Sequence, residues 1–345
     1  MNHRIFYYSG GGLGWEPIRR MVDIGLHLFD AELIDISGTQ DSVLSRVRST
    51  LIRAPTGEGG GDIFIARRPH ELKNLISHPE FHQRRMFRAI WIIDSCFTEE
   101  WPKPTKRLLD NFDFVGYTQY ADAEFYQTLC RDRAVHLGWG TDALNMHKVD
   151  EARKIDVLRV GRQPAQWDND VRTEEACNAI SLKFHGRPPA LPDSRTSYDE
   201  LLAKWYSATK VVIAHSNLAS PVAYGHKSKE YITARWADAL ACGAVVAGVQ
   251  PTKDIKLVNW PGALICFDRI DLNENLLYLA EALKNWNVDI ARHNKLEALR
   301  RLDWRWRFDT LSNFFSLKPS ALTVELDDLR SLITFEEGHL NTCYS

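Results

Sequence analysis

The chain has 345 residues, of which 44% are hydrophobic and 26% charged, and its formal net charge is -2. This length predicts two domains rather than one core, and the near-neutral charge gives no support for nucleic acid as a partner. No apolar run of 18 residues occurs and the six scattered cysteines form no C-x-x-C pair, so we expect a cytoplasmic protein with reduced thiols and no membrane span.

The first half of the chain alternates between short apolar runs and longer polar segments. The runs predicted as strands cover residues 4–8, 32–36, 62–66, 89–93, 112–116 and 134–137. The first run ends in a glycine-rich turn, GGGLG, and residues 18–28 then follow with helical spacing of apolar side chains. This alternation predicts a parallel, doubly wound α/β sheet.

A second series of strands and helices begins at residue 155. Its predicted strands cover residues 155–160, 182–185, 211–215, 244–247 and 263–267, with helices at 173–180, 197–208 and 233–241. Further helices are predicted at 276–286, 293–302 and 304–315. We therefore expect domains at 1–150 and 151–300, a helix within 301–316 and a partly ordered tail at 317–345.

The segment KEYITARWADALACGAVV, residues 229–246, is the most informative. Thr233 is suited to the N-cap of a helix, whose first amide groups then form a positive end that accepts a phosphate. Arg235 adds a charge to the same anion, and Asp238, about one turn further on, is suited to bind a ribose diol. Gly243 ends the helix before the next strand.

This segment resembles the donor-binding domain of GT-B glycosyltransferases of the group-1 and spore-maturation-protein-like branch, in which Glu-x7-Glu leads into an Ala-x-Ala-x-Gly helix. The resemblance implies two Rossmann-like domains with a cleft between them, the acceptor on the first and the donor on the second. It implies that Glu230 faces the donor sugar, Asp238 binds the ribose and Tyr231 lies in the donor site. Two departures are the aspartate at 238 and Lys-Ser-Lys in place of the glycine-rich approach to the helix.

Two more segments carry the resemblance. Val160-Gly161-Arg162 follows a predicted strand where the family has a Gly-Arg step, which implies that Arg162 contacts the diphosphate; the alternative is an exposed loop arginine. The family's lysine a few residues on is absent, and Trp167 occupies that vicinity. Residues 303–308, DWRWRF, resemble the terminal helix that crosses back to the N-terminal domain.

Four further features have both a functional and a structural interpretation. Gly12 lies in the GGGLG turn, which either approaches the donor phosphates or is a bare tight turn, and lacks the G-x-G-x-x-G spacing of a dinucleotide site. Asp94 follows a strand and either contacts the acceptor or caps a helix; His215 either binds the donor or is a buried structural histidine. Asp168-Asn169-Asp170 has the D-x-D form of a metal site, but its place at a helix start favours capping, so we expect no essential metal and no cofactor.

Together these features predict a glycosyltransferase that moves a sugar from a nucleotide-diphosphate donor to a hydroxyl acceptor. The Glu230-type acid favours retention of the anomeric configuration. Two rival functions remain open: a nucleotide-sugar epimerase of the same fold, and a non-catalytic relative that acts as a binding or regulatory subunit.

Overall fold

The chain forms two compact units. The structure, a computed structural model, describes residues 3–38, 59–83, 85–146, 149–187 and 195–342. The first unit comprises Met1–Trp139 and Trp304–Leu326, and the second comprises Gly140–Asp303 and Asp327–Ser345. The chain therefore enters the second unit after Trp139 rather than at residue 150, because Thr141 already pairs with Asp303 of that unit.

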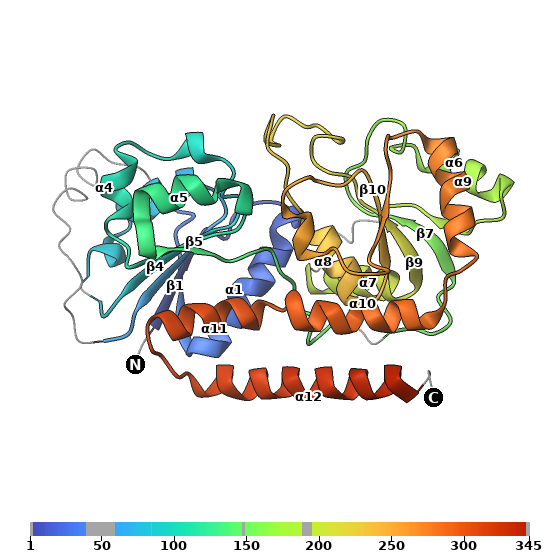
Figure 1. Cartoon of the computed structure of the whole chain (residues 1–345). Helices are drawn as coiled ribbons and strands as arrows, with labels where there is room; N and C mark the ends of the chain where they lie inside the picture. Colours follow the sequence, from blue (N-terminus) through green and yellow to red (C-terminus); the bar gives the residue numbers. More distant parts are fainter. Residues whose placement is uncertain (1–2, 39–58, 84, 147–148, 188–194, 343–345) are drawn as a thin grey trace. The chain divides into compact units, whose positions relative to one another are not determined.

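The first unit is built on a six-stranded parallel sheet in the order β2-β1-β3-β4-β5-β6 (Figure 1). Its strands are β1 (His3–Tyr7), β2 (Ala31–Asp35), β3 (Asp62–Ala66), β4 (Arg88–Ile92), β5 (Phe114–Tyr117) and β6 (Ala134–His136). Strands β1, β3 and β4 are buried along their whole length. Each begins with polar or charged residues and continues as an apolar run, as expected for a sheet covered on both faces.

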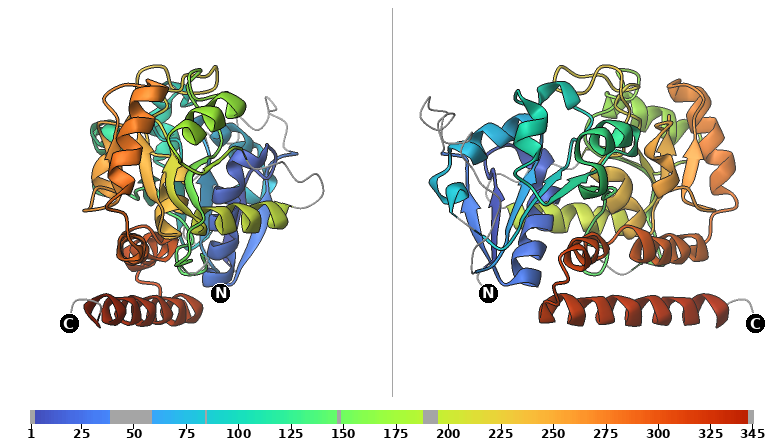
Figure 2. Two further views of the ribbon diagram at one scale, coloured as in Figure 1. Left: turned by 90° about the vertical axis from the view of Figure 1, so that its right-hand side faces the viewer. Right: turned by 60° about the vertical axis from the view of Figure 1, so that its left-hand side comes forward.

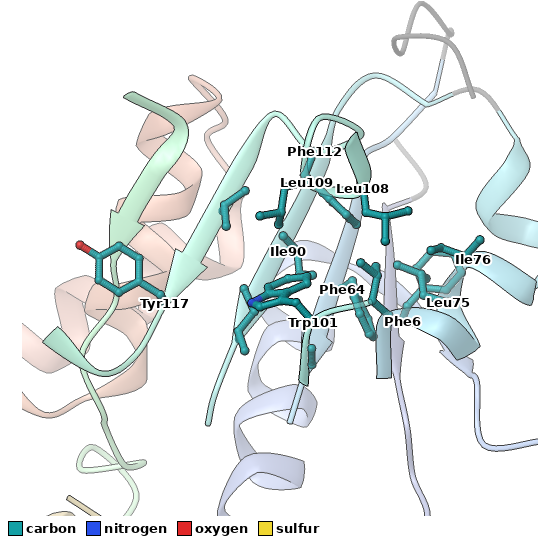
Figure 3. Packing of buried hydrophobic residues seen from close by; sticks show 14 of the residues in the cluster. Phe6, Phe64, Leu75, Ile76, Ile90, Trp101, Leu108, Leu109, Phe112 and Tyr117 are labelled. Atoms are coloured by element: carbon teal, nitrogen blue, oxygen red, sulfur yellow. The ribbon is translucent and has the colours of Figure 1, made fainter. Parts of the chain in front are cut away.

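Helices cover both faces of this sheet (Figure 2). They are α1 (Glu16–Phe29), α3 (Leu72–Ser77), α4 (Thr105–Leu109), α5 (Ala123–Cys130) and α11 (Trp304–Phe314). On one face, Phe64 and Ile90 of the sheet pack with Trp101 and Leu108 (Figure 3). On the other, Phe308 of α11 lies edge-on to Trp91, and the absence of a side chain at Gly25 of α1 lets Phe308 approach.

The second unit is built on a five-stranded parallel sheet in the order β11-β10-β9-β7-β8. Its strands are β7 (Ile155–Arg159), β8 (Phe184–His185), β9 (Thr209–Ile213), β10 (Val245–Gly248) and β11 (Leu264–Cys266). Its helices are α6 (Asp170–Ala179), α7 (Arg195–Ser207), α8 (Ala234–Ala241), α9 (Leu272–Leu283) and α10 (Val288–Arg301). Both units are thus parallel α/β folds, which confirms the predicted fold class.

The expectation of a partly ordered tail at 317–345 is wrong. Residues Ser320–Thr342 form one helix, α12, and Leu322, Leu326 and Leu329 on it are buried. Their spacing of four and three residues puts them on one helix face, which gives this segment an apolar stripe to bury. Within the described ranges, none of the helices combines the length and the apolar character that a membrane span requires.

Candidate functional site

A sharp turn follows β7 at the carboxyl edge of the second sheet. Gly161 has a φ of +65°, in the left-handed region that favours glycine. The Nη1 atom of Arg235, at the start of α8, donates to the carbonyl oxygens of Val160, at 2.9 Å, and of Arg162. Arg235 therefore fixes the backbone of the turn that carries Arg162.

Three arginines lie around this turn, and one of them, Arg159, is paired with the carboxylates of Asp168 and Asp170. Arg235 is half-buried, and desolvation together with the nearby charges of Arg162 and Arg159 lowers the pKa of its guanidinium to about 10. It is still a cation at neutral pH. We call Arg159, Arg162 and Arg235 the arginine cluster; it lies where ligands bind in parallel α/β sheets, at the carboxyl ends of the strands.

The first turn of α8 adjoins the arginine cluster through Arg235. Thr233 has the extended backbone of an N-cap, as predicted, although its side chain makes no capping hydrogen bond. Its Oγ1 atom is buried and has no hydrogen-bond partner within the part of the chain that the structure describes. The positive end of a helix and a hydroxyl group thus lie next to a cation, a combination suited to an anion.

Asp238 has a protein partner. Its side chain is 6% exposed, and Oδ1 accepts a hydrogen bond from Thr141 Oγ1 at 2.5 Å. The backbone amide of Thr141 donates to Leu302 O, so Asp238 helps to hold the segment by which the chain enters the second unit. This bond gives the aspartate at 238 a structural role, and its contact with a ribose stays a prediction.

Glu230 and Tyr231 precede α8. Glu230 Oε2 accepts from both the amide and the hydroxyl of Thr252, each at 2.8 Å, which ties the approach to α8 to the loop after β10. Tyr231 is buried, and its amide donates to Asn217 Oδ1 at 3.1 Å. The structure thus places both residues at the carboxyl edge of the sheet.

His215 follows β9 and is only 1% exposed. Its Nδ1 atom accepts from the amide of Val249 at 3.1 Å, which places the proton of the neutral ring on Nε2. Burial lowers the pKa of His215 to about 3, so the ring is neutral at physiological pH. Nε2 has no hydrogen-bond partner among the described residues, which leaves a buried donor beside the ring of Trp167.

Trp167 lies in the core of the second unit. The indole is fully buried, stacks on Phe267 and donates Nε1–H to Ile270 O at 3.0 Å. The position is part of the core of the unit, and a cation there would lose its hydration. The arginine cluster supplies positive charge nearby instead.

The D-x-D sequence caps a helix. Asn169 is the N-cap of α6, and its side chain accepts from the amide of Arg172 at 3.1 Å. Both aspartates form ion pairs with Arg159, Asp168 at a short distance and Asp170 at 2.9 Å. Across the described ranges no group of three or more histidine, cysteine, aspartate or glutamate side chains is arranged to hold a metal ion.

In the first unit, the glycine-rich turn follows β1. Gly11 has a φ of +125°, and the Nη1 atom of Arg67 donates to the carbonyl oxygen of Gly10. The guanidinium of Arg67 lies 4.4 Å from the ring centroid of Tyr8 and bonds to Glu71. A Cβ atom on Gly12 would meet no atom within 4 Å, so the protein leaves that residue open to approach.

Asp94 follows β4 at the carboxyl edge of the same sheet. Its side chain is 14% exposed and lies 3.7 Å from Arg68 Nε, and Arg68 also pairs with Glu100 at 3.1 Å. Burial raises the pKa of Asp94 to about 7, although the positive charge of Arg68 opposes the shift. The short helix that follows, Thr98–Glu100, has Phe97 at its N-cap, so Asp94 does not cap it.

Solved structures resemble this chain in fold. No protein-family model matches the chain, and no curated protein does. Among solved structures, HepE of Anabaena in complex with UDP and glucose superimposes with a TM-score of 0.55 at 12% identity, covering 92% of this chain and 99% of HepE. A glycosyltransferase of Rickettsia africae superimposes with a TM-score of 0.55 at 9% identity. The match covers 91% of this chain and 98% of the Rickettsia chain.

Sucrose-phosphate synthase of Thermosynechococcus elongatus superimposes with a TM-score of 0.53 at 12% identity. The match covers 90% of this chain and 98% of the synthase chain. The chain has the GT-B fold. At these identities the likeness shows the fold alone, and the chemistry has to be argued from the residues of this chain.

Proposed function

We propose that this chain transfers a sugar from a nucleoside-diphosphate sugar to a hydroxyl acceptor. The observation that carries the proposal is the arginine cluster beside the start of α8, because it gathers fixed cations and a positive helix end at the edge of a GT-B sheet. The solved HepE structures with UDP and with UDP-glucose agree with a donor of this class.

In this proposal the diphosphate is the leaving group. Arg162 and the first turn of α8 stabilise the negative charge that develops on it, and Nε2–H of His215 is a further donor in the same region. Glu230 faces the sugar, and Asp94 of the first unit contacts the acceptor hydroxyl. Retention of configuration and independence of metal are part of the proposal, since fixed cations take the place that a metal has in D-x-D enzymes.

A second candidate is a non-catalytic nucleotide-sugar binder. The observation that favours it is that both acids of the predicted pair have protein partners, Glu230 with Thr252 and Asp238 with Thr141. Such a protein binds the donor without turnover. A nucleotide-sugar epimerase, in contrast, converts the donor when no acceptor is present.

A thermal-shift screen against UDP, GDP, ADP and dTDP with their glucose or mannose derivatives tests the first step. We expect one nucleotide series to raise the melting temperature, since a ligand at 100 times its Kd stabilises the folded state by about 2.7 kcal/mol. NMR of the donor alone and then with added sugar acceptors separates the three functions. Transfer only with an acceptor supports the proposal, epimerised donor contradicts it, and binding without product with any acceptor favours the second candidate.

A further inference from the structure

A long loop connects β9 to α8 and is drawn in yellow in Figure 1. One side chain, that of Asn217, holds both of its ends together. Asn217 Nδ2 donates to the carbonyl oxygens of His226, at 3.3 Å, and Lys229, at 2.9 Å, while Oδ1 accepts from the amide of Tyr231. Hydrogen bonds between residues of the loop therefore fix its conformation.

Tyr224 lies at the corner of this loop. The amide of Gly225 donates to Val222 O at 3.2 Å, and Lys227 Nζ donates to the same oxygen at 3.2 Å, which closes a turn around Tyr224. The tyrosine side chain is 66% exposed. The hydrogen-bonded turn holds this exposed aromatic ring in a defined position. Binding a ligand to the ring therefore costs little additional conformational entropy of the loop.

The ring of Tyr224 adjoins the arginine cluster. The guanidinium carbon of Arg162 lies 5.6 Å from its ring centroid, within the range of a cation–π contact. Because Arg235 fixes the backbone of Arg162, the ring has a defined place beside the site at which we propose the diphosphate binds. A ligand that places phosphates on Arg162 brings its neighbouring group to the face or edge of Tyr224.

We propose that Tyr224 is a specificity-determining residue that stacks against the sugar of the donor. This rests on the proposed function. The two groups next to a diphosphate are the sugar and the nucleoside, and both present a face to an aromatic ring. The sugar is favoured because Tyr224 and Glu230 belong to the same tethered loop, and Glu230 is the residue proposed to face the sugar. The C–H groups on one face of a pyranose pack on an aromatic ring, with the hydroxyl groups directed outward.

The test compares matched ligands by calorimetry on the full chain. The probes are UDP with UDP-glucose, GDP with GDP-mannose, ADP with ADP-glucose and dTDP with dTDP-glucose, and the pair that binds the wild type is used for the variants. In Tyr224→Ala we expect the Kd of the sugar nucleotide to rise about tenfold while the Kd of the nucleoside diphosphate stays within about twofold. Tyr224→Phe keeps the ring and is expected to bind both ligands as the wild type does.

The other outcomes of the calorimetric test overturn either the role of Tyr224 or the proposed function. An equal loss of affinity for both ligands in Tyr224→Ala places the ring on the nucleotide and overturns the proposal. Unchanged affinity for both ligands also overturns it. If no pair binds the wild type, the proposed function fails instead, which is a separate result. Because the side chain is exposed, an unchanged melting temperature of Tyr224→Ala shows that the loss of binding is not a loss of folding.

Discussion

Asp94 is a carboxyl group whose pKa of about 7 lies within the physiological range. Burial is the main cause, and the carboxylates of Glu100 and Glu71 add to it while Arg68 opposes it. A group of this kind changes its charge when the pH moves by one unit, and perturbed pKa values are typical of functional sites. Its position after β4, at the carboxyl edge of the sheet, agrees with the proposed contact with the acceptor.

The raised pKa of Asp94 has a consequence for stability that requires no substrate. Because the pKa is higher in the folded chain than in the unfolded one, the folded state binds more protons between about pH 4 and pH 7. Its contribution to stability therefore falls as the pH rises through that window. We expect Asp94→Asn to melt at a higher temperature than the wild type at pH 8, and we expect this difference to be much smaller at pH 4.5, near the pKa of the unfolded carboxyl group.

Asp132→Asn is the matched control, since Asp132 is exposed on the same unit. Calorimetric melting curves at the two pH values measure both variants. A melting temperature of Asp94→Asn that is lower than that of the wild type at pH 8 contradicts the account, because it means that the ionised carboxylate is stabilised in the folded chain.

Local sequence predicted the helix start in the candidate site, but it did not predict the hydrogen-bond partners of the two acids. Thr233 was predicted at an N-cap and is there, because capping depends on residues close in sequence. The partners of Asp238 and Glu230, Thr141 and Thr252, lie far from them in the chain. Only the folded topology brings such pairs together, so no local pattern predicts them.

At the scale of elements, the buried strands were predictable and the short helices were not. Strand β3 was predicted with its observed bounds, Asp62–Ala66, since it is buried on both faces and is apolar after Asp62. Helices α4 and α5 have five and eight residues, too few for a clear helical period. Helix α12 was missed, although the spacing of Leu322, Leu326 and Leu329 in the sequence is that of one helix face.

Helix α12 offers a direct test of its own packing. Leu329 is fully buried, and replacing it with alanine removes apolar contacts and leaves a cavity. We expect Leu329→Ala to lower the free energy of unfolding by about 2–4 kcal/mol. Val324 on the same helix is 59% exposed, so Val324→Ala is expected to change it by less than about 0.5 kcal/mol.

Denaturant titration measures both changes. Equal effects of the two substitutions, or no effect of Leu329→Ala, contradict the description of α12 as a packed helix with one buried face. A loss confined to Leu329→Ala agrees with it and shows that residues beyond 317 contribute to the stability of the folded chain.

At the scale of the whole molecule, the net charge does not reveal the feature on which the proposed function rests. A net charge of -2 gives no indication of a cationic site, yet Arg159, Arg162 and Arg235 lie near one another. Two of them come from the end of β7 and the turn after it, and the third from the start of α8, so the parallel topology of the sheet assembles the cluster. The unit boundary also depends on topology, because Trp304–Leu326 belongs with the first unit.

In the proposed function, the arginine cluster binds the diphosphate of a nucleotide sugar. Calorimetric titration of the wild type, Arg162→Gln and Arg172→Gln with the nucleoside diphosphate found in the screen tests this role. Arg172 is an exposed arginine on α6 of the same unit and controls for a change of overall charge. We expect Arg162→Gln to raise the Kd about 10- to 100-fold, since a hydrogen bond to a charged group contributes about 1.5–3 kcal/mol. Arg172→Gln is expected to bind as the wild type does, and equal affinity of all three proteins would contradict the account.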